Sequence, residues 1–461
     1  MSAPGFPPPP GEEKISLPLP EPVNEALARL EAAGWEAVAV GGCVRDLLRG
    51  VPPGDFDLAT SAPPEATERV FAGEKLVETG LKHGTVTVLI GGMPLEITTF
   101  RVDGGYSDGR RPDGVRFTAS LREDLARRDF TVNAMALNWR GNLCDPFGGR
   151  EDLKAGILRC VGEPAARLRE DGLRILRALR FAAALDFEIE PATAAALSRE
   201  RERLRLVSPE RVQAELRKLL CGPAVRRVLL DYTEVLGVAL PELLPMRGFD
   251  QRNIHHIYDV LEHSAAAVEA VPPTPTLRLA ALLHDAGKPD CFTLDEQGCG
   301  HFYGHPERSA ELADAALRRL RFDTAIRERV VLLVRCHDRP IAGTEAALRR
   351  ALNRLGPEVF FELLQLKRAD NLAQSPAYRG RQAEYDALER AARALLDRGD
   401  CLSLKTLAVH GGDLIAAGFT PGRELGDTLR RLLNAVLDGE ALNEKEALLA
   451  LAEKGRKICV P

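Results

Sequence analysis

The sequence lacks long apolar runs. No window of eighteen or more consecutive apolar residues occurs in its 461 residues, whereas a membrane-spanning helix needs about 20 of them. The first residues, MSAPGFPPPPGEEK, have neither the basic start nor the apolar core of a secretory signal. We therefore expect no membrane partner, and the prolines predict a flexible, extended tail over residues 1–22.

The sequence also lacks paired cysteines and internal repeats. Its nine cysteines are scattered, without a single Cys-x-x-Cys pair. This spacing argues against a disulfide framework and against a zinc ribbon, so we expect a reducing, cytoplasmic location. The absence of a repeat of fixed period argues against a solenoid.

Neither sign of charge dominates the chain. Lys and Arg number 62 against 67 Asp and Glu, which gives a net charge of −5. Basic residues are nevertheless concentrated between Arg159 and Lys218, in a stretch that includes the run SRERERLRL. Such a surface suits a polyanion, but a solvated helix face with Glu–Arg pairs at i,i+4 explains the run equally well.

Two aspartates in the stretch GDFDLAT carry the first chemical signal. Asp55 and Asp57 are separated by one residue, and in a β-strand such residues point to the same face. Converging carboxylates need a cation between them, and Mg²⁺ takes oxygen ligands while keeping positions open for substrate phosphates. Because Asp-x-Asp also occurs in ordinary turns, the pair alone leaves that alternative open.

The residues upstream of the aspartates favour a phosphate site. EAVAVGGCVRDLLRG predicts a strand over 36–40, a Gly41–Gly42 turn and a helix that opens near Cys43 with Arg45 in its first turn. Glycine lets the backbone come close to a ligand, and the N–H groups at a helix start favour phosphate. We expect Gly42 and Arg45 to hold substrate phosphate beside the aspartates.

Five motifs follow one another in the first half of the chain: GGCVRD, DFDLAT, LEITTFR, RRDFTVNAMA and REDGLRILRALRF. In this order they resemble the class II tRNA nucleotidyltransferase and poly(A) polymerase family. The resemblance implies that Asp55 and Asp57 bind Mg²⁺ for phosphoryl transfer, that Arg128 meets phosphate and that Asp129 meets the ribose hydroxyls. Glu96 is either a third carboxylate of this site or simply an exposed strand residue.

The motif REDGLRILRALRF contains the residues that we expect to read the base. Asp171 and Arg174 are three residues apart, hence neighbours on a helix surface. The Asp171 carboxylate is an acceptor for the amine of cytosine or adenine, and the Arg174 guanidinium is a donor to the bare ring nitrogen beside that amine. Uracil and guanine present a carbonyl and an N–H at these places, so both hydrogen bonds would have the wrong polarity. Arg177 and Arg180 follow at the same three-residue spacing, and we expect them to reach the triphosphate. A salt-bridged amphipathic helix is the alternative.

The resemblance implies template-independent addition of C and A nucleotides to the 3′ end of tRNA, with CTP and ATP as substrates. The segment from Arg101 to Phe117 is rich in glycine and charge and predicts a mobile loop, which in this family accompanies the switch from C to A addition. An A-adding enzyme or a poly(A) polymerase is the alternative within the family.

Seven of the nine histidines lie between His255 and His337. The segments around them resemble the HD phosphohydrolase pattern of bacterial family members that carry an HD metal-binding domain. This resemblance implies a transition metal such as Ni²⁺, Co²⁺ or Mn²⁺. Its expected ligands are His263, His284, Asp285 and Asp370, and His305 and His337 are expected to bind a second ion or phosphate. Metal-dependent phosphate hydrolysis is therefore a competing function, and an HD fold without metal is the structural alternative.

The expected architecture is an α/β nucleotidyltransferase head followed by all-α neck, HD and tail domains. The head spans 23–160, with strands near 36–40, 55–59, 84–90 and 94–101 and a hairpin turn at Gly91–Gly92. The neck spans 161–247, the HD domain 248–375 and the tail 376–461. A Ser208–Pro209 helix start marks one element of the neck.

Overall fold

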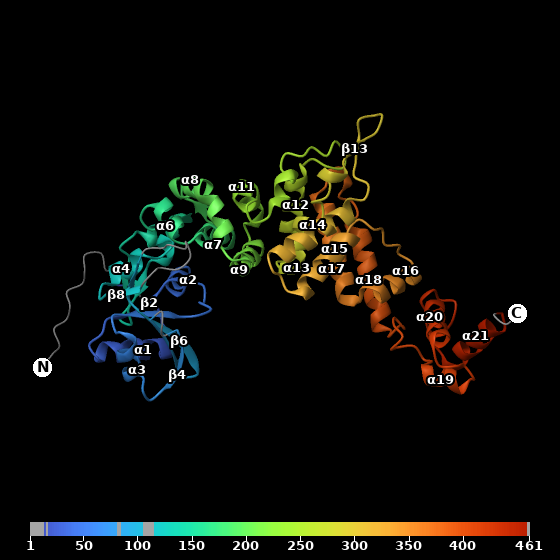
Figure 1. Ribbon diagram of the computed structural model, residues 1–461, viewed down its shortest axis with the longest axis horizontal. Helices are drawn as coiled ribbons and strands as arrows, with labels where there is room; N and C mark the ends of the chain where they lie inside the picture. Colours follow the sequence, from blue (N-terminus) through green and yellow to red (C-terminus); the bar gives the residue numbers. More distant parts are fainter. Residues whose placement is uncertain (1–12, 15–16, 81–83, 105–114, 459–461) are drawn as a thin grey trace. The chain divides into compact units, whose positions relative to one another are not determined.

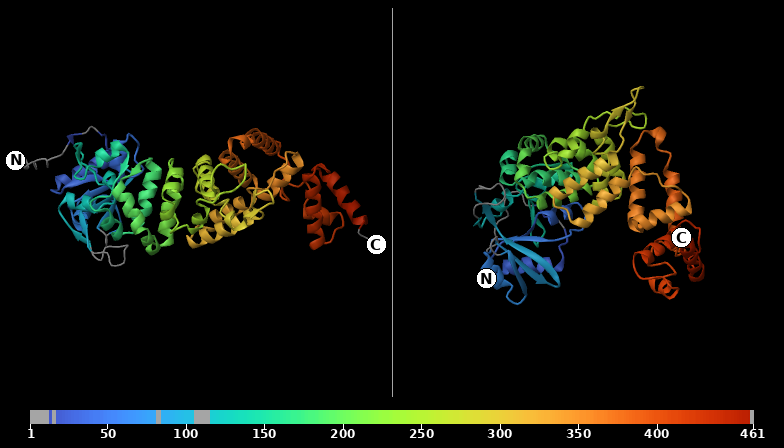
Figure 2. Two further views of the ribbon diagram at one scale, coloured as in Figure 1. Left: turned by 90° about the horizontal axis from the view of Figure 1, so that it is seen from above. Right: turned by 45° about the vertical axis from the view of Figure 1, so that its right-hand side comes forward.

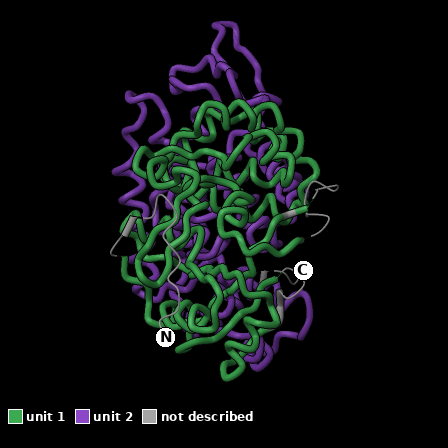
Figure 3. Tube along the Cα trace, turned by 90° about the vertical axis from the view of Figure 1, so that its left-hand side faces the viewer, with its two compact units in different colours: residues 1–241 green, residues 242–461 purple. Residues whose placement is uncertain are grey.

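The computed structural model describes residues 13–14, 17–80, 84–104 and 115–458, which form two compact units (Figures 1 and 3). Unit 1 comprises residues 1–241 and unit 2 comprises 242–461. Most of the expected proline-rich tail, and residues 105–114 of the expected mobile loop, lie outside the described residues. Two residues of the tail region, Glu13–Lys14, form strand β1 and pair with β10 (Asn142–Cys144). Among the described residues, no helix is long and apolar enough to cross a bilayer.

The head is built on an eight-stranded mixed sheet (Figure 2) with the order β1-β10-β9-β2-β3-β6-β5-β4. The central strands are β2 (Ala37–Val40) and β3 (Asp57–Thr60), which pair antiparallel, and β6 (Met93–Thr99), which pairs parallel with β3. The others are β4 (Lys75–Gly80), β5 (Thr85–Ile90) and β9 (Ala136–Leu137). A shorter pair, β7 (Arg101–Asp103) and β8 (Val115–Phe117), leads into and out of the loop region.

Both faces of the sheet are buried, which explains the unbroken apolar run of β2. Ala37 and Ala39 face one core, and Val38 and Val40 face another. The first core is completed by helices α1 (Glu21–Ala32), α2 (Gly42–Leu48) and α3 (Pro64–Val70), and the second by α4 (Leu121–Ala126). Since successive strand residues point to opposite faces, a strand covered on both sides needs apolar residues at every position.

The expected hairpin is confirmed. Strands β5 and β6 pair antiparallel with Ile90 opposite Met93, so that Gly91 and Gly92 alone form the turn. Their φ angles of +56° and +82° are those of a tight hairpin turn that glycine adopts without a steric cost. This turn fixes which residues of β6 face the core and which face solvent.

The rest of unit 1 is mostly helical. Its helices are α5 (Gly149–Ala155), α6 (Pro164–Glu170), α7 (Leu173–Leu185), α8 (Pro191–Glu200), α9 (Pro209–Leu220), α10 (Val225–Asp231) and α11 (Thr233–Leu236). The neck is not entirely α-helical, because β12 (Glu188–Ile189) pairs with β11 (Ile157–Leu158). The run SRERERLRL ends in a 3₁₀ helix, Arg201–Leu206, whose Arg203 and Arg205 pair with Glu200 and Glu202 at i,i+3 and not at i,i+4.

Unit 2 is also mostly helical. Its helices are α12 (Val260–Ala270), α13 (Pro275–Leu283), α14 (His305–Arg319), α15 (Thr324–Cys336), α16 (Glu345–Leu355), α17 (Pro357–Ala373), α18 (Gln382–Asp397), α19 (Gly411–Ala416), α20 (Arg423–Leu437) and α21 (Lys445–Ile458). A capping box of Asp259 and Glu262 starts α12. The hairpin of β13 (Thr293–Leu294) and β14 (Gly300–His301) projects from these helices (Figures 1 and 2).

Candidate active site and metal centre

Three carboxylates meet at one end of the head sheet. Asp57 is the first residue of β3, and its register partner in the parallel strand β6 is Glu96. Register partners on neighbouring strands point to the same face, so these two side chains are neighbours. Asp55 does not lie in the strand, which begins two residues later than we expected, but it is still close enough to act on Asp57. We call Asp55, Asp57 and Glu96 the head site.

The head site is exposed and negatively charged. All three side chains are open to solvent. The pKa of Asp57 is raised by partial removal from water and by the nearby charges of Asp55 and Glu96, and Arg128 opposes this rise. Oxygen ligands that repel one another at an open surface fit a hard divalent cation with free coordination positions.

The Gly41–Gly42 turn lies beside the head site and requires glycine at its first position. Gly41 has φ +80°, and a Cβ there would lie 2.9 Å from Nη1 of Arg128. The Arg128 guanidinium therefore packs directly on the turn backbone. α2 begins at Gly42, one residue before the expected start.

Arg45 is buried and held by two partners. It donates through Nε and Nη2 to Asp46, at 2.9 Å each, and through Nη1 to Oδ1 of Asn133, at 2.7 Å. A Cβ on Gly42 would lie 3.6 Å from its Nη2. Arg45 thus ties the start of α2 to the motif RRDFTVNAMA.

Asp129 is buried and fully hydrogen-bonded. Its Oδ1 accepts from the backbone N–H of Phe130 at 2.9 Å and from Asn133 at 3.2 Å, and its Oδ2 accepts from Nε of Arg177 at 2.8 Å. Burial alone would raise the pKa of Asp129, but Arg177 and Asn133 lower it to about 2. The pair of Asp129 and Arg177 joins the head to α7.

Arg177 and Arg180 share a carboxylate from α9. Nε of Arg180 lies 2.7 Å from Oε2 of Glu215, and Nη1 of Arg177 lies 3.7 Å from Oε1 of Glu215. Both guanidinium groups also lie over the ring of Phe181, at 5.3 Å for Arg177 and 3.7 Å for Arg180. The arginine stripe expected to reach the triphosphate is thus assembled into one charged cluster.

Asp171 and Arg174 are not on one helix, contrary to our expectation. α6 ends at Glu170 and α7 begins at Leu173, so Asp171 lies in the break between them. Gly172 permits this break, since a Cβ there would lie 2.7 Å from the backbone oxygen of Arg203. Asp171 accepts from the N–H of Leu173 at 2.9 Å and pairs with Arg211, whereas Arg174 pairs with Glu170.

A groove of about 660 Å³ lies beside Glu170. It is lined mainly by arginines and small residues of β7, β8, α4 and α6: Val102, Gly104, Arg116, Glu123, Ala126, Arg127, Ala166, Arg167, Arg169 and Glu170. The head-site carboxylates are not among these residues. The groove therefore adjoins the expected base-reading residues and not the expected metal ligands.

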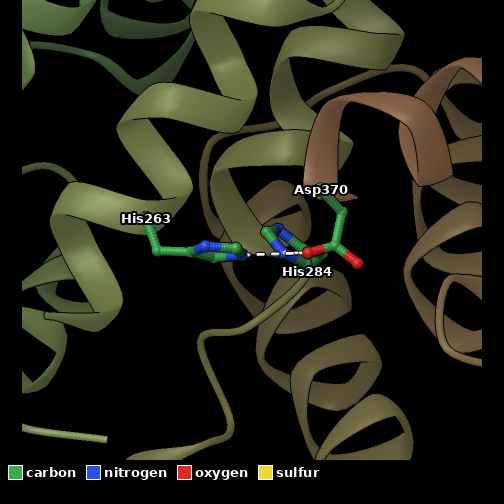
Figure 4. Close-up of side chains that lie close together, drawn as sticks. All are labelled: His263, His284 and Asp370. Carbon is green, nitrogen blue, oxygen red and sulfur yellow. Dashed lines mark hydrogen bonds and ion pairs between the residues drawn. The ribbon is translucent and has the colours of Figure 1, made fainter. Parts of the chain in front are cut away.

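In unit 2, six side chains from α12, α14, α17 and the ends of α13 and α15 converge. We call His263, His284, Asp285, His305, His337 and Asp370 the histidine cluster (Figure 4 shows three of them). All are buried except Asp370, which is half-buried. His263, His284 and Asp370 form one group whose potential ligand atoms lie within 4.8 Å of one another, and His284, Asp285 and His337 form a second.

All four histidines of the cluster are held by backbone carbonyls at Nδ1. The acceptors are the oxygens of Ala373, Ala281, Phe302 and Val334, at 3.3, 2.8, 2.8 and 2.7 Å from His263, His284, His305 and His337 respectively. A carbonyl oxygen only accepts, so Nδ1 carries the proton and the lone pair of the neutral ring is on Nε2. Metal-ligating histidines usually donate their other ring N–H in this way, which fixes the orientation of the ring.

The Nε2 atoms converge on carboxylates and on one another, at positions where either a proton or a metal ion could bind. Nε2 of His263 lies 3.0 Å from Oδ1 of Asp370, and the Nε2 atoms of His305 and His337 lie 3.2 Å apart. Nε2 of His284 is buried without a hydrogen bond. Burial would lower the pKa of His284, but Asp285 and Asp370 raise it to about 10, so a metal ion that binds Nε2 would replace a proton there. The donor set therefore fits a transition metal.

Lys288 and His256 border the cluster. Nζ of Lys288 lies 2.7 Å from Oδ2 of Asp285 and donates to Gln251 at 2.8 Å. The ring of His256 packs 4.9 Å from that of His263, and burial lowers the pKa of His256 to about 3, aided by Lys288. His255 packs on Tyr378 at 4.0 Å.

A third group of potential ligands, Asp295, Cys299 and His301, occupies the exposed hairpin β13–β14. Here the carboxylate of Asp295 accepts from the backbone N–H groups of Gln297 and Cys299 and pairs with His301. These contacts are those of an aspartate that stabilises a turn, so they explain the position of Asp295 without a metal ion.

Sequence reasoning missed Asn133, Arg211 and Glu215. Asn133 lies within the quoted motif RRDFTVNAMA, but an asparagine gives no charge signal. Arg211 and Glu215 are four residues apart in the predicted helix after Ser208–Pro209, so their shared face was predictable. Their partners Asp171, Arg177 and Arg180 lie 35 to 40 residues away along the chain, so these pairs were not predictable.

Family models match three stretches of the chain. The poly A polymerase head domain matches residues 37–159, the probable RNA and SrmB-binding site of polymerase A matches 186–246, and tRNA nucleotidyltransferase domain 2 (putative) matches 305–452. Together they support the division into an α/β head and a mostly helical remainder.

Whole-chain relatives agree with these matches. The CCA-adding enzyme of Limosilactobacillus fermentum is 35% identical over 94% of this chain and 96% of its own length. That of Streptococcus sanguinis is 35% identical over 95% of this chain and 98% of its own. The crystal structure of the Bacillus stearothermophilus CCA-adding enzyme in complex with CTP is 30% identical, with a TM-score of 0.72, and covers 95% of this chain and 98% of its own.

Proposed function

The chain belongs to the family of CCA-adding enzymes and is a nucleotidyltransferase, and we propose that it adds C and A from CTP and ATP to the 3′ end of tRNA. The observation that carries this proposal is the register of β3 and β6, which sets Asp57 beside Glu96 with Asp55 two residues away. The solved relative at 30% identity is described in complex with CTP, which supports CTP as a substrate.

Asp55 and Asp57 would hold Mg²⁺, with Glu96 as the third carboxylate. Burial raises the pKa of Asp57 and the charges of Asp55 and Glu96 add to this rise, and a bound cation relieves that repulsion. Bound Mg²⁺ supplies charge neutralisation at the attacking hydroxyl and at the leaving pyrophosphate. The chain itself contributes alignment, because the β3–β6 ladder fixes Asp57 against Glu96 before substrate arrives.

Arg128 would meet the triphosphate, and the packing of its guanidinium on the Gly41–Gly42 turn next to the head site supports this role. Arg45, Asp129, Arg177 and Arg180 are already paired with one another or with neighbours. Direct nucleotide contacts by these residues require an exchange of partners. An arginine that leaves a carboxylate for a phosphate keeps a charge-assisted hydrogen bond, but it leaves the buried Asp129 or Glu215 without its cation, so the exchange requires a new partner for that carboxylate.

Asp171 and Arg174 would read the base edge. Asp171 is ion-paired and hence an acceptor, and Arg174 is always a donor. An acceptor beside a donor matches cytosine and adenine and rejects uracil and guanine.

The test is single-nucleotide extension of three tRNAs that end before C, after C and after CC, with CTP and ATP supplied separately. The full CCA activity predicts CTP use on the first two substrates and one ATP on the third. An A-adding enzyme would use only the third tRNA, and a poly(A) polymerase would continue beyond one A. No extension of any tRNA would refute the proposal.

The histidine cluster supports a second function, metal-dependent hydrolysis of phosphate esters. The supporting observation is that four Nδ1 atoms are fixed by carbonyls and their Nε2 atoms converge on two carboxylates. His263, His284, Asp285 and Asp370 would hold Ni²⁺, Co²⁺ or Mn²⁺, with His305 and His337 as further ligands. A bound transition metal supplies an activated water. Substrates of this class include 2′,3′-cyclic phosphates at RNA ends.

Metal analysis and hydrolysis test this second function together. After loading with Mn²⁺ or Co²⁺ and gel filtration, we expect the wild-type protein to retain metal and to hydrolyse a 2′,3′-cyclic nucleotide. A protein that retains no metal and hydrolyses nothing would leave the cluster with a structural role.

We further propose a head over 23–160, a base-reading neck over 161–247, a metal-binding domain over 248–375 and a helical tail over 376–461. The match of residues 186–246 to a probable RNA-binding model supports RNA contacts in the neck. A cytoplasmic location fits both tRNA maturation and the free thiols of the described cysteines.

A further inference from the structure

We propose that Tyr303, stacked on His301, binds the base of a nucleotide whose terminal phosphate reaches the histidine cluster. The ligand is a nucleotide or an RNA end that carries a 2′- or 3′-phosphate or the cyclic form of both, and not a phosphate ester without a base. This inference deepens the second proposed function, phosphate-ester hydrolysis at the histidine cluster, and rests on it.

Tyr303 presents an open aromatic ring. It is 78% exposed, the largest value among the large apolar and aromatic side chains of the described residues. One face of the ring is covered by His301, whose ring lies nearly parallel, at an angle of 8° and with 5.4 Å between the centroids. A ring this exposed has its other face free, and nucleobases at single-stranded RNA ends stack on such faces.

The hairpin β13–β14 holds these two rings, which we call the aromatic platform. Nε2 of His301 lies 2.9 Å from Oδ2 of Asp295. Asp295 is fixed in turn, because its Oδ1 accepts from the backbone N–H groups of Gln297 and Cys299, at 2.9 Å each. The aromatic platform is therefore ordered before a ligand arrives, so binding loses little side-chain entropy.

A short segment ties the aromatic platform to the histidine cluster. The backbone oxygen of Phe302 lies 2.8 Å from Nδ1 of His305, and the ring of Phe302 lies 5.2 Å from Nζ of Lys288. Nζ of Lys288 also lies 2.7 Å from Asp285. Because Tyr303 and His305 are two residues apart, their Cα atoms are separated by at most about 7 Å. A nucleotide whose base stacks on Tyr303 can thus place its phosphate at the cluster.

The histidine cluster is open to solvent beside this segment. The side chain of His305 is 11% exposed, whereas those of the other three histidines are at most 3% exposed. Asp370, from α17, is the other accessible member, with a side chain that is 24% exposed. Nε2 of His305 lies 3.4 Å from Oδ1 of Asp285, so a phosphate that enters beside His305 meets the centre of the cluster.

The loop before α12 continues this surface. The backbone oxygen of Arg252 accepts from the N–H of Gly300 at 2.8 Å, and Asn253 donates to the oxygen of Gly300 at 3.3 Å. The same loop exposes Ile254 and Ile257. Adjoining segments thus carry an aromatic ring, apolar side chains and a metal-binding centre, which match the base and the phosphate of a nucleotide. A phosphate ester without a base would leave the ring and the apolar side chains uncovered.

The first experiment measures kcat and KM of the full-length, Mn²⁺-loaded protein with two substrates. One is 2′,3′-cyclic AMP, and the other is methyl riboside 2′,3′-cyclic phosphate, which has a methoxy group in place of the base. The variants are Tyr303→Ala, Tyr303→Leu and Tyr303→Phe. The matched control is Leu442→Ala, which removes an exposed apolar side chain of unit 2 outside the hairpin. Thermal melting confirms that each variant is folded.

We expect Tyr303→Ala to raise KM for 2′,3′-cyclic AMP by about 10–100-fold, since this is the loss that removal of one stacked base produces. The value of kcat should change little, because the metal ligands are untouched. Tyr303→Phe keeps the ring and should retain the wild-type KM. KM for the methyl riboside substrate should be the same in all variants, and Leu442→Ala should behave as the wild type with both substrates.

The second experiment requires neither metal nor hydrolysis. The full-length protein, with and without Mn²⁺, is irradiated in the presence of 8-azidoadenosine 3′-phosphate, and mass spectrometry of its peptides locates the label. We expect label on the peptide that contains His301 and Tyr303 in the wild type, and its loss in Tyr303→Ala. Label at the nucleotide site of the head should be equal in all variants and serves as the internal standard.

An equal rise of KM for both substrates in Tyr303→Ala would show that Tyr303 only stabilises the hairpin, and it would overturn the inference. Wild-type KM and unchanged labelling in Tyr303→Ala would overturn it as well and would leave the exposed ring to a protein partner. A wild-type protein that hydrolyses nothing but carries the label that depends on Tyr303 would refute hydrolysis and uphold base binding. Hydrolysis of both substrates with equal KM, without this label, would uphold hydrolysis and refute base binding. If Tyr303→Ala does not fold, Tyr303→Leu supplies the same comparison, because it keeps an apolar side chain without a ring.

Discussion

The head site and the histidine cluster place carboxylates in opposite surroundings. Asp55, Asp57 and Glu96 are exposed and have only oxygen donors, whereas Asp285 is 1% exposed and is surrounded by imidazole nitrogens. Open oxygen sites suit a hard ion that arrives and leaves with a nucleotide. Buried nitrogen and oxygen sites suit a transition metal that stays with the protein. The proposed function thus assigns two classes of metal chemistry to two separate sites of one chain.

The largest expected effect is on the head site. Asp57→Asn should reduce nucleotide addition by at least about 10³-fold, because loss of a metal ligand removes roughly 4 kcal/mol of transition-state stabilisation. tRNA binding, measured by gel shift, should change little. Metal retention at the histidine cluster should be unchanged.

The matched control is Glu65→Gln on α3, an exposed carboxylate of the same unit outside the head site. Its rate should equal that of the wild type. Near-normal addition by Asp57→Asn would remove this residue from the metal site.

The second prediction concerns the histidine cluster. His284→Ala should weaken binding of Mn²⁺ or Co²⁺ by at least about 100-fold, since a direct ligand contributes more than the groups that hydrogen-bond to ligands, whose loss costs about 10–100-fold. Equilibrium dialysis with elemental analysis measures this affinity. CTP and ATP addition with Mg²⁺ should stay within about 2-fold of wild type, because an independent site is not coupled to the head.

Removal of metal by a chelator also tests whether the two sites are independent. After treatment with EDTA and return of Mg²⁺ alone, nucleotide addition should recover fully and phosphate-ester hydrolysis should not. Loss of addition in a folded His284→Ala variant would show instead that the two sites are coupled.

The smallest effect is expected at the contact between head and neck. Asp129→Asn should lower the free energy of unfolding of unit 1 by about 2 kcal/mol at pH 7, since one pKa unit corresponds to about 1.4 kcal/mol. The folded pKa of about 2 lies below the ordinary value of 3.8 for an aspartate. The contribution is therefore present above pH 4 and is lost as the pH falls toward 2, with about half remaining at pH 3.

Urea unfolding followed by tryptophan fluorescence measures this effect, because both tryptophans, Trp35 and Trp139, lie in unit 1. A difference between variant and wild type that is the same at pH 7 and pH 3 would show that the pairing with Arg177 does not lower the pKa of Asp129.

Local patterns in the sequence predicted much of this structure. The strand predicted over 36–40 follows from its apolar run and is observed as Ala37–Val40, and the hairpin follows from Gly91–Gly92. All six members of the histidine cluster were identified before their geometry was known. These predictions depend only on residue type and on the spacing of residues close together in the sequence, and both can be read from the sequence itself.

What could not be predicted depends on distant contacts. Asp55 falls outside β3 because strand pairing with β6 begins only at Asp57. The break before α7 depends on the close approach of Gly172 to Arg203, 31 residues later. The partners of Arg211 and Glu215 are set by the packing of α7 on α9, which spacing along one helix does not reveal.

The pairing of β3 with β6 has a consequence for protein engineering. Because a hydrogen-bonded ladder and not a loop sets Asp57 against Glu96, the connection between these strands can vary in length without moving the two carboxylates, provided that the ladder keeps its alignment. A slip of one residue would turn Glu96 toward the interior and bring Leu95 or Ile97 to the surface. Insertions after α3 should therefore be tolerated, whereas an added residue within β6 should inactivate the enzyme.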